Sequence, residues 1–390
     1  MDMTPSRPNR RFALQAAASV LAAWSPWATS VARAQSGSGS TSGTATNTTT
    51  NTSFHTEFYP PVKPRPLAFP QDHGAHPAYR TEWWYLTGWL GQGPSAIGFQ
   101  LTFFRSRTQH APDNPSRLAP HQLLFAHAAM AVGQENRFMH ANRAGRVNGS
   151  SLRAGTSDTD LQFEDWHLRR TQGQATETYE GYFSDQDFSL SLQASTAQTV
   201  ILRGQDGWSQ KGPKPEQASH YYSRAPLRVT AKAQWGQQTK TLEGQAWLDH
   251  EWSSQLLMPG AVGWDWLGIN LLDGGTLMAF RIRGNQSESL YDHVDARDRQ
   301  GQPSQHWDGL RWQAAGRWRS KSLIDYPIPM ELLVGGVVYR LVPLMMAQEV
   351  DARASTGGFY WEGAVSLMKG EQLLGHGYLE LTGYGAPLRL

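Results

Sequence analysis

Short runs in which apolar and polar residues alternate recur along most of this chain, and they limit its fold more than any other feature. Every second side chain is apolar in residues 97–103, and the same period of two occurs in residues 187–192 and 277–282. Glycine-rich turns such as residues 273–275 separate these runs. Because successive side chains of a strand point to opposite faces, the pattern predicts many short strands. We therefore expect an all-β protein built from sandwiches or closed barrels.

The first 34 residues are predicted to be an export signal. The pair Arg10-Arg11 precedes a modestly apolar run that ends in a small-x-small cleavage pattern at Ala34. That run is too short and too polar for a permanent membrane span. Residues 35–69 are rich first in Ser, Gly and Thr and then in Pro, which predicts a flexible linker. We expect a periplasmic or secreted protein, exported by the twin-arginine route and without a transmembrane span.

A weak internal repeat divides the rest of the chain. Residues 84–88, with the run that follows them, are similar to residues 264–268 and their following run. The later part of the repeat can be aligned in two ways. One alignment pairs residues 243–244 with 362–363, and the other pairs residues 244–249 with 375–380. Either way, a domain boundary is predicted near residue 255, with one domain at 70–254 and a second at 255–390.

The charge balance and the lack of cysteine exclude several classes of function. The net charge of +2 disappears with the predicted signal: without its four arginines and one aspartate, 31 basic and 32 acidic residues remain. A near-neutral chain has no electrostatic footprint for nucleic acid. The chain has no cysteine, so disulfides, thiolate metal sites and cysteine nucleophiles are excluded. No nucleotide-binding fingerprint occurs in a suitable context, and no cofactor is predicted.

Aromatic residues gather around isolated carboxyl groups in three stretches of the sequence. Residues 79–90, 247–252 and 263–268 each combine tryptophans with one or more acidic residues. One buried aromatic residue belongs to a core, but such dense groups with a charge among them suggest aromatic walls and a polar floor. We interpret the three stretches as the walls of one or two binding cavities.

Several motifs together resemble the AttH-like family, which is related to the carotenoid 1,2-hydratases and is often labelled as predicted secreted hydrolases. These motifs are Glu82-Trp83-Trp84-Tyr85, Ser219-His220-Tyr221-Tyr222-Ser223, Ala246-Trp247-Leu248-Asp249-His250-Glu251-Trp252, Trp264-Asp265-Trp266, Tyr360-Trp361-Glu362-Gly363 and the closing Gly377-Tyr378-Leu379-Glu380-Leu381-Thr382-Gly383-Tyr384. The match extends over about residues 70–390. The resemblance implies two tandem lipocalin-like, calycin-type antiparallel β-barrels and an extended apolar ligand such as an isoprenoid or a lipid. The predicted ligand-binding residues are Glu82, Trp83, Trp84, Tyr85, His220, Tyr221, Tyr222, Trp247, Trp252, Trp264, Trp266 and Trp361.

The acidic cluster around Asp249 offers the groups that hydration of an alkene needs. A carboxylic acid walled by indoles keeps its proton, because burial disfavours the anion. Indole faces attract a carbocation, and a histidine or second carboxylate can deprotonate the attacking water. Asp249, His250, Glu251 and Asp265 are the predicted catalytic residues, with Asp249 as first choice for the proton donor. Alternatively, these residues form a structural hydrogen-bonded plug.

Other ionisable groups allow two interpretations each. Glu82 could pair with Arg80 as a structural ion pair, which is the favoured interpretation, or act as a second acid. His73 and His76 with Asp72 could hold a metal ion, but two close imidazoles on a loop are a weak signal, and no metal is predicted. A lone histidine on an apolar strand, such as His127, is expected to be a core residue.

These observations lead to one expected function and two alternatives. We expect an exported protein that binds an apolar molecule and hydrates it by acid–base catalysis without a cofactor. The alternatives are a periplasmic lipid carrier or chaperone without chemistry, and a hydrolase of an ester or lactone. The H-E-x-x-H and G-x-S-x-G patterns are both missing. The sequence leaves the ligand, the presence of catalysis and the oligomeric state open.

Overall fold

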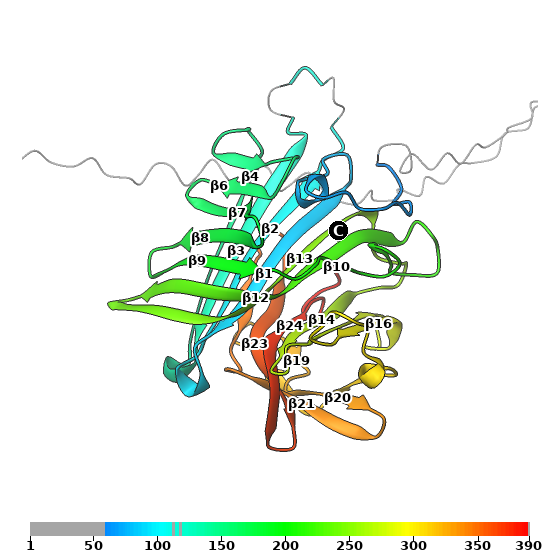
Figure 1. Cartoon of the computed structure of the whole chain (residues 1–390). Coiled ribbons are helices and arrows are strands. Elements are labelled where there is room, and N and C mark those ends of the chain that lie inside the picture. The colour runs from blue at the N-terminus through cyan, green and yellow to red at the C-terminus, as the bar shows by residue number, and fades with distance from the viewer. Residues whose placement is uncertain (1–58, 111–113, 117–118, 389–390) are drawn as a thin grey trace, which may run out of the picture. The chain divides into compact units, whose positions relative to one another are not determined.

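The computed structural model describes residues 59–110, 114–116 and 119–388 (Figure 1). The predicted export signal, residues 1–34, and most of the predicted linker lie outside the described residues. The described helices are short 3-10 turns: η1 (Gln71–His73), η2 (Gly93–Ser95), η3 (Gly133–Glu135) and η4 (Gln305–Trp307). None of them is long and apolar enough to cross a membrane. Strands make up most of the remaining structure, which confirms the predicted all-β class.

The first sheet is antiparallel and curls into a nearly closed barrel. Its strands follow the order β4-β3-β2-β1-β13-β12-β9-β8-β7-β6-β5, with β10 and β11 paired to β12. The two ends of this sheet approach each other, since β3, the neighbour of the end strand β4, contacts both β5 and β6. The strands are β1 (Thr81–Leu90), β2 (Ile97–Arg107), β3 (Gln122–Val132), β4 (Arg137–Arg146), β5 (Leu152–Ala154), β6 (Asp160–Phe163), β7 (Trp166–Gln172), β8 (Glu177–Ser184), β9 (Phe188–Thr196), β10 (Ile201–Leu202), β11 (Trp208–Gln210), β12 (Ala218–Trp235) and β13 (Gln238–Gln255).

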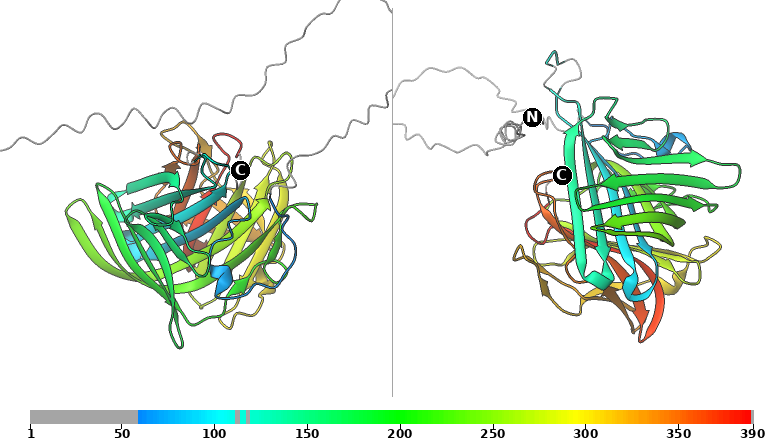
Figure 2. Two further views of the ribbon diagram at one scale, coloured as in Figure 1. Left: turned by 90° about the horizontal axis from the view of Figure 1, so that it is seen from above. Right: turned by 90° about the vertical axis from the view of Figure 1, so that its left-hand side faces the viewer.

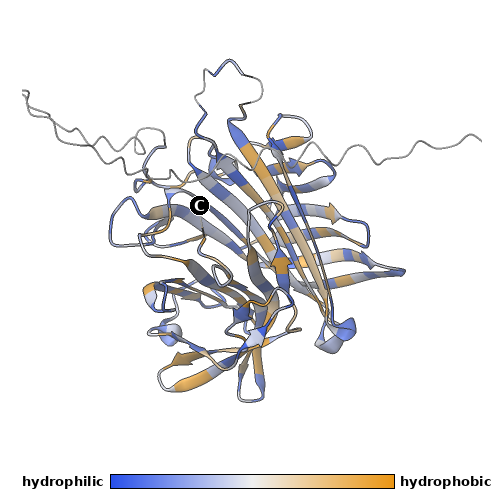
Figure 3. Ribbon diagram, turned by 180° about the vertical axis from the view of Figure 1, so that it is seen from behind, coloured by the Kyte–Doolittle hydropathy of each residue, from blue (hydrophilic) through white to orange (hydrophobic). Residues whose placement is uncertain are grey.

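The core of this barrel follows the alternation in the sequence. On β9, Phe188, Leu190 and Leu192 point into the core, while Ser191 is exposed. Apolar and polar residues likewise alternate along many of the strands in Figure 3. The predicted period of two is therefore confirmed in the first sheet. Removing this apolar surface from water stabilises the barrel, at roughly 25 cal/mol for each Å² buried.

The second sheet is an antiparallel half-barrel. Its strands follow the order β16-β15-β14-β24-β23-β21-β20-β17, with β22 paired to β23, and β18 and β19 form a separate pair. The strands are β14 (Gly263–Leu271), β15 (Thr276–Arg283), β16 (Ser289–Arg297), β17 (Arg311–Ala314), β18 (Trp318–Arg319), β19 (Asp325–Tyr326), β20 (Met330–Val334), β21 (Val337–Pro343), β22 (Glu349–Asp351), β23 (Phe359–Lys369) and β24 (Gln372–Leu381).

The two sheets repeat one strand order, which bears on the internal repeat. The segment β2-β1-β13-β12 of the first sheet corresponds to β15-β14-β24-β23 of the second. Strands β13 and β24 therefore occupy equivalent places, as the alignment of residues 244–249 with 375–380 requires. The competing alignment, of residues 243–244 with 362–363, places part of β13 on β23. Strand β23 is the neighbour of β24, which is the true equivalent of β13. The repeat thus gives Asp249 and Glu380 matching positions in the two sheets.

A third apolar cluster joins the outer faces of the two sheets. The rings of Tyr85 and Trp266 meet edge to face at 5.2 Å between centroids, and Trp247 lies 6.0 Å from Trp266. On β15, Met278 and Phe280 face this cluster, whereas Leu277 and Ala279 face the core of the second sheet. Figure 2 shows the central strands of the first sheet running beside those of the second. The central strands are buried on both faces, and each face can carry a site.

Candidate functional site

Strands β1 and β13 lie side by side, and they carry two different groups of predicted site residues on their two faces. Tyr85 pairs with Asp249 across the ladder, and Trp84 pairs with His250. Because side chains alternate along a strand, Tyr85 and Asp249 point toward the second sheet, while Trp84 and His250 point into the first barrel. The predicted residues therefore form two sites, not one.

The first site is a cavity between the two sheets. Its space free of protein atoms measures about 820 Å³, and part of that space is open to solvent. Its apolar walls are Trp83, Phe104, Leu256, Leu257, Trp264, Trp266, Phe280 and Ile282. Its polar lining comprises Thr81, Tyr85, Lys211, Tyr221, Asp249, Glu251, Glu362 and Glu380.

Asp249 lies in this cavity and is held by three donors. It accepts hydrogen bonds from the Tyr221 hydroxyl (2.6 Å), from Trp247 Nε1 (2.7 Å) and from the Ser223 hydroxyl. Burial raises the pKa of Asp249 to about 6, although the nearby Arg203 and the three hydrogen bonds oppose this rise. Glu251, on the same face of β13, has its own cation.

That cation is Lys211, which lines the cavity together with Glu251 and Asp249. Its Nζ is 3.1 Å from the Glu251 carboxylate, and the Ser219 hydroxyl also donates to Glu251. Burial lowers the pKa of Lys211, and the charge of Glu251 partly restores it. The ammonium group also lies 4.0 Å from the centre of the Phe280 ring. This part of the cavity therefore holds a buried ion pair against an aromatic wall.

Two further carboxyl groups, Glu362 and Glu380, lie opposite each other on β23 and β24. Side chains in this relation are about 5 Å apart at Cβ. Burial raises the pKa of Glu362 well above its usual range, and the charge of Glu380 raises it further. Burial also raises the pKa of Glu380 to about 7, against a 2.9 Å hydrogen bond from Trp264 Nε1. Glu362 therefore keeps its proton at neutral pH, beside a carboxyl that is close to half ionised.

Neither of these glutamates was predicted as a site residue, although two signals in the sequence pointed to them. Glu380 matches Asp249 in one alignment of the repeat, and Glu362 stands in the Tyr-Trp-Glu-Gly motif. Neither signal shows that both side chains meet in one cavity. Their meeting depends on the pairing of β23 with β24 and on the packing of one sheet against the other.

A chain of polar groups leads from the Glu362 carboxyl toward the surface. The Tyr360 phenol is a polar neighbour of Glu362 and lies 2.6 Å from Nδ1 of His127. The Nε2 atom of His127 lies 2.8 Å from the hydroxyl of Ser355, which is half-buried. Burial lowers the pKa of His127 to about 3, so its imidazole is neutral. His127 is buried as expected, but it links two polar groups.

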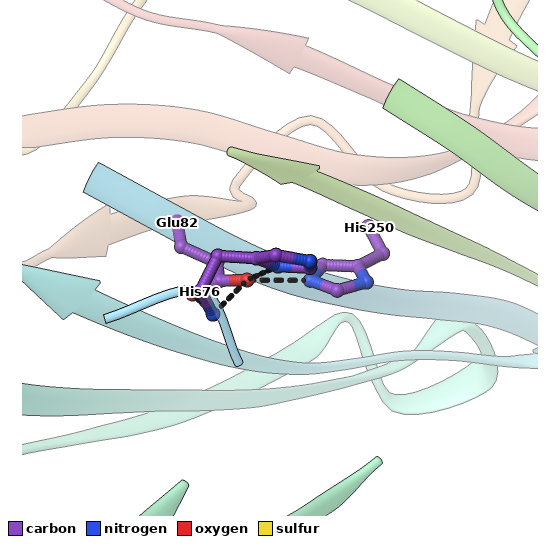
Figure 4. A group of neighbouring side chains, drawn as sticks. All are labelled: His76, Glu82 and His250. Carbon is purple, nitrogen blue, oxygen red and sulfur yellow. Dashed lines mark hydrogen bonds and ion pairs between the residues drawn. The ribbon is translucent and has the colours of Figure 1, made fainter. Parts of the chain in front are cut away.

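The second site lies on the opposite face of β1 and β13, where two imidazoles converge on one carboxylate oxygen (Figure 4). Oε1 of Glu82 is 2.7 Å from Nδ1 of His76 and 2.9 Å from Nε2 of His250. The sequence favoured Arg80 as the ion-pair partner of Glu82, and this was wrong. Arg105 on β2 is the partner, with Nε 2.7 Å from Oε2 of Glu82. Arg105 is opposite Glu82 on the neighbouring strand, which the sequence could not show.

The pKa of the buried carboxyl group in this second site shifts in the opposite direction from the pKa of Glu362 in the cavity. Burial opposes ionisation of Glu82, but the charges of Arg105 and His76 hold the pKa of Glu82 well below its usual range. Burial lowers the pKa of His250 to about 4. Glu82 is therefore a fixed anion. The donor atoms of His76, Glu82 and His250 all lie within 4.8 Å of one another, a group of a kind that could hold a metal ion.

The remaining predicted residues divide between these places and the cores. Trp84 stacks on His250, with centroids 4.4 Å apart, and Trp252 stacks on His76 at 3.7 Å. His220 and Tyr222 accompany them, since Tyr222 hydrogen-bonds His250 and His220 packs near Trp252. Five other predicted residues of this first barrel line the cavity, namely Trp83, Tyr85, Tyr221, Asp249 and Glu251. Trp247 packs in the apolar cluster beside them.

In the second sheet, the predicted residues also fall on two faces. Trp264 and Trp266 line the cavity. Asp265 turns away from it and forms ion pairs with Arg281 and Arg283 at 2.7 and 2.8 Å. Trp361 packs in the core of the second sheet and donates from Nε1 to the carbonyl of Met346. His73, the other histidine weighed as a metal ligand, hydrogen-bonds Tyr222 and does not join the group around Glu82.

Comparisons with known proteins agree on the family and the fold. A family model described as AttH-like matches residues 60–384. A Nitrosomonas europaea protein described as a candidate AttH has a crystal structure with a TM-score of 0.74, 37% sequence identity, and coverage of 83% of this chain and 99% of that chain. Kievitone hydratase from Nectria haematococca has a TM-score of 0.60 and 11% identity, covering 84% of this chain and 98% of that chain, so its likeness concerns the fold alone. No curated protein matches the chain significantly.

Proposed function

The chain belongs to the AttH-like family, and we propose that it is a hydratase that adds water to a carbon–carbon double bond of an apolar molecule bound between its two sheets. One observation carries this proposal. The carboxyl pair of Glu362 and Glu380 lines a cavity in which half of the lining residues are indole, phenyl or aliphatic. A protonated acid beside an ionised one, in apolar surroundings, is the acid–base pair that hydration of an isolated alkene needs.

The steps follow from the protonation states of this pair. The Glu362 carboxyl gives its proton to one alkene carbon, which leaves a carbocation on the other. The faces of Trp264 and Trp266 stabilise the cation through their quadrupoles. A water molecule then attacks the cation and loses a proton to the Glu380 carboxylate, which completes the alcohol. Because the two carboxyl groups are neighbours, passing this proton from Glu380 back to Glu362 restores the starting state.

Asp249 takes a different role in this proposal from the one that the sequence suggested. Its carboxylate already accepts hydrogen bonds from Tyr221, Trp247 and Ser223. Three donors directed at a carboxylate stabilise the anion, and so we assign Asp249 as a fixed negative charge that faces the cation. Tyr85, Tyr360 and Gln100 also donate toward Glu362, but burial and the charge of Glu380 outweigh them and keep its pKa well above the usual range, so Glu362 is the stronger candidate for the acid.

The substrate class follows from the lining of the cavity. Eight apolar side chains line it, which suits a hydrocarbon chain such as that of an isoprenoid or a lipid. The name of kievitone hydratase identifies that protein as a hydratase, and a shared fold makes the same type of reaction worth testing here. Export through a twin-arginine signal, which Arg10-Arg11 suggests, would place the reaction in the periplasm or outside the cell.

The reaction can be tested by the origin of the oxygen in the product. The purified mature chain is incubated in H₂¹⁸O with a panel of alkenes that includes geraniol, farnesol, squalene, lycopene and kievitone, and the products are analysed by mass spectrometry. We expect one substrate to gain a labelled water. Glu362→Gln should abolish most of this product, whereas Glu180→Gln, a change at an exposed position on β8, should leave it unchanged.

Two other outcomes identify the alternative functions. Binding of an apolar compound without any labelled alcohol would contradict the hydratase and support a carrier. Cleavage of an ester or lactone would support a hydrolase. Within the described part of the chain, the residues that line the cavity include no serine, cysteine or histidine, so a hydrolase using such a nucleophile has less support.

A further inference from the structure

We propose that His76, Glu82 and His250 bind a single divalent transition-metal ion, with Zn²⁺ as the ion that the donor set fits best. This site is independent of the proposed hydration, because it lies on the opposite face of β13 from the cavity. Two imidazole nitrogens and one carboxylate oxygen are a ligand set of zinc sites that keep a position open for water or another ligand. The same set also binds Fe²⁺, and loading the chain with each metal separates the two ions.

The three donor atoms converge on one point. Nδ1 of His76 and Nε2 of His250 lie 2.7 and 2.9 Å from the same oxygen, Oε1 of Glu82, and all three atoms lie within 4.8 Å of one another. Ligands of a tetrahedral zinc ion, with bonds of about 2.0–2.1 Å, lie roughly 3.3–3.4 Å apart. Each nitrogen would therefore need to move away from the Glu82 oxygen by only about half an ångström to admit the ion.

Each ligand is also oriented by a second group, as ligands in metal sites usually are. Nε2 of His76 is 2.9 Å from Asp72, and Nδ1 of His250 is 3.1 Å from the Tyr222 hydroxyl. Arg105 binds Oε2 of Glu82 and leaves Oε1 facing the two imidazoles. These contacts fix which atom of each ligand points to the common centre.

Stacking fixes the planes of both rings. His76 lies almost parallel to Trp252, at 7° and 3.7 Å between centroids. His250 stacks on Trp84 at 19° and 4.4 Å. Two indoles therefore hold the imidazoles from outside while the polar partners hold their edges. Preorganisation of this kind lowers the entropy cost of binding an ion.

Binding requires a defined movement of protons. A ligating nitrogen must present a lone pair, so the hydrogen that His250 directs from Nε2 toward Glu82 moves to Nδ1, where the Tyr222 oxygen accepts it. His76 keeps the hydrogen on Nε2, which faces Asp72, and releases the one on Nδ1 to solvent. The ion replaces these two hydrogens beside Glu82. The negative charges of Glu82 and Asp72 then face the ion and its ligands.

The ion would join parts of the chain that are distant in sequence. His76 belongs to the loop after η1, Glu82 to β1, and His250 to β13. Only His76 of the three is measurably exposed, with 13% of its side chain accessible, which makes its loop the route for the ion. Binding should therefore stabilise the fold, since a ligand that binds only the folded chain raises its stability.

The test measures metal binding directly, with a variant at the exposed ligand. The mature chain is treated with chelator, loaded with Zn²⁺ alone, desalted and analysed for metal by mass spectrometry. We expect a single ion per chain, and a thermal midpoint that rises with added Zn²⁺. His76→Gln should lose both effects, and His121→Gln, at an exposed histidine outside the cluster, should keep both.

Loading with Co²⁺ provides a second measurement that does not depend on stability. Cobalt bound by two imidazoles and a carboxylate gives the strong visible absorption of a four-coordinate ion, which aqueous Co²⁺ lacks. We expect this spectrum in the wild type and in His121→Gln but not in His76→Gln. His250→Gln repeats the test at a buried ligand, and if that variant does not fold, His76→Gln decides alone. The proposal is overturned if the wild type retains no ion or if His76→Gln binds as well as the wild type. Loading with Fe²⁺ in preference to Zn²⁺ would overturn only the choice of ion.

Discussion

Glu82 and Glu362 are buried to the same extent, with 0% and 1% of their surfaces exposed, yet their pKa values shift in opposite directions. Glu82 faces Arg105 and His76, whose positive charges outweigh the cost of burial. Glu362 faces Glu380 and a set of phenols, so its charge would be neither paired nor hydrated. The difference shows that burial alone does not decide the state of a carboxyl group. The groups opposite it on the neighbouring strand decide.

The largest expected effect is on the hydration rate, and it compares the two candidate proton donors, Glu362 and Asp249. Glu362→Gln keeps the shape of the side chain but removes the proton, and should lower the hydration rate by roughly 10²–10⁴-fold. Asp249→Asn, which removes a fixed charge only, should lower the rate less. Both rates are measured with the substrate found in the labelling experiment, together with ligand affinity and thermal midpoint. A greater loss in Asp249→Asn would return the role of donor to the residue that the sequence favoured.

The second expected effect is on stability, and it compares the loss of the ionised Glu82 with the loss of the protonated Glu362. Glu82→Gln leaves the buried Arg105 without its carboxylate, and removing one partner of a buried pair costs about 3–5 kcal/mol. Glu362→Gln removes a group that is already neutral and should change the free energy of unfolding far less. Urea unfolding of both variants, at pH 7 and in the presence of chelator, gives the two values. Equal losses would mean that Glu362 is also ionised and paired, against our assignment.

The strand pattern predicted these faces in part. Alternation along residues 247–252 puts Trp247, Asp249 and Glu251 on one face of a strand, and all three lie on the cavity side of β13. The same alternation puts His250 on the opposite face of β13 from Asp249, although both residues were predicted to belong to one catalytic cluster. In the same way, alternation on β14 turns Asp265 toward Arg281 and Arg283 and away from the cavity. Local periodicity therefore gives the face of a residue but not what that face meets.

The fold was predictable to a greater extent than the site for a physical reason. Alternation, turns and the repeat are properties of short segments, and the motifs added the tandem arrangement through a family resemblance. Glu362 and Glu380 acquire their unusual pKa values from strands β13, β14, β23 and β24 together. Lys211 similarly enters the cavity from the loop before β12. Such contacts depend on tertiary packing, which has no pattern in a single sequence.

A third effect concerns pH and needs no substrate. The pKa of Glu380 is about 7 in the folded chain and about 4.3 when unfolded. A carboxyl whose pKa is raised on folding binds its proton more tightly in the folded state, so its contribution to stability is full below about pH 4.3 and is lost as the pH rises to 7. Glu380→Gln cannot lose this contribution. Its thermal midpoint relative to wild type should therefore rise between pH 4 and pH 8, and a constant difference would contradict the raised pKa.

The smallest expected effect concerns His127, which we treat as a positioning residue because it acts through Tyr360. The row of polar groups from the half-buried Ser355 through His127 and Tyr360 leads to Glu362. It is a path by which protons return to the acid after each turnover. If Glu380 supplies most of them, loss of His127 should slow hydration only severalfold, below the 10²–10⁴-fold expected for the acid itself. We expect His127→Ala to show this loss together with a lower thermal midpoint, because Tyr360 and Ser355 lose a buried hydrogen-bond partner. Added imidazole should then restore part of the rate, because a small base can enter the space that the side chain leaves.

Rescue distinguishes a proton path from packing, since a variant that is slow because its barrel is distorted does not recover in imidazole. His167→Ala, at a histidine of β7 outside this row, controls for the effect of imidazole on the assay. A full rate in His127→Ala would remove the row from the mechanism and leave the exchange between Glu362 and Glu380 as the sole supply of protons.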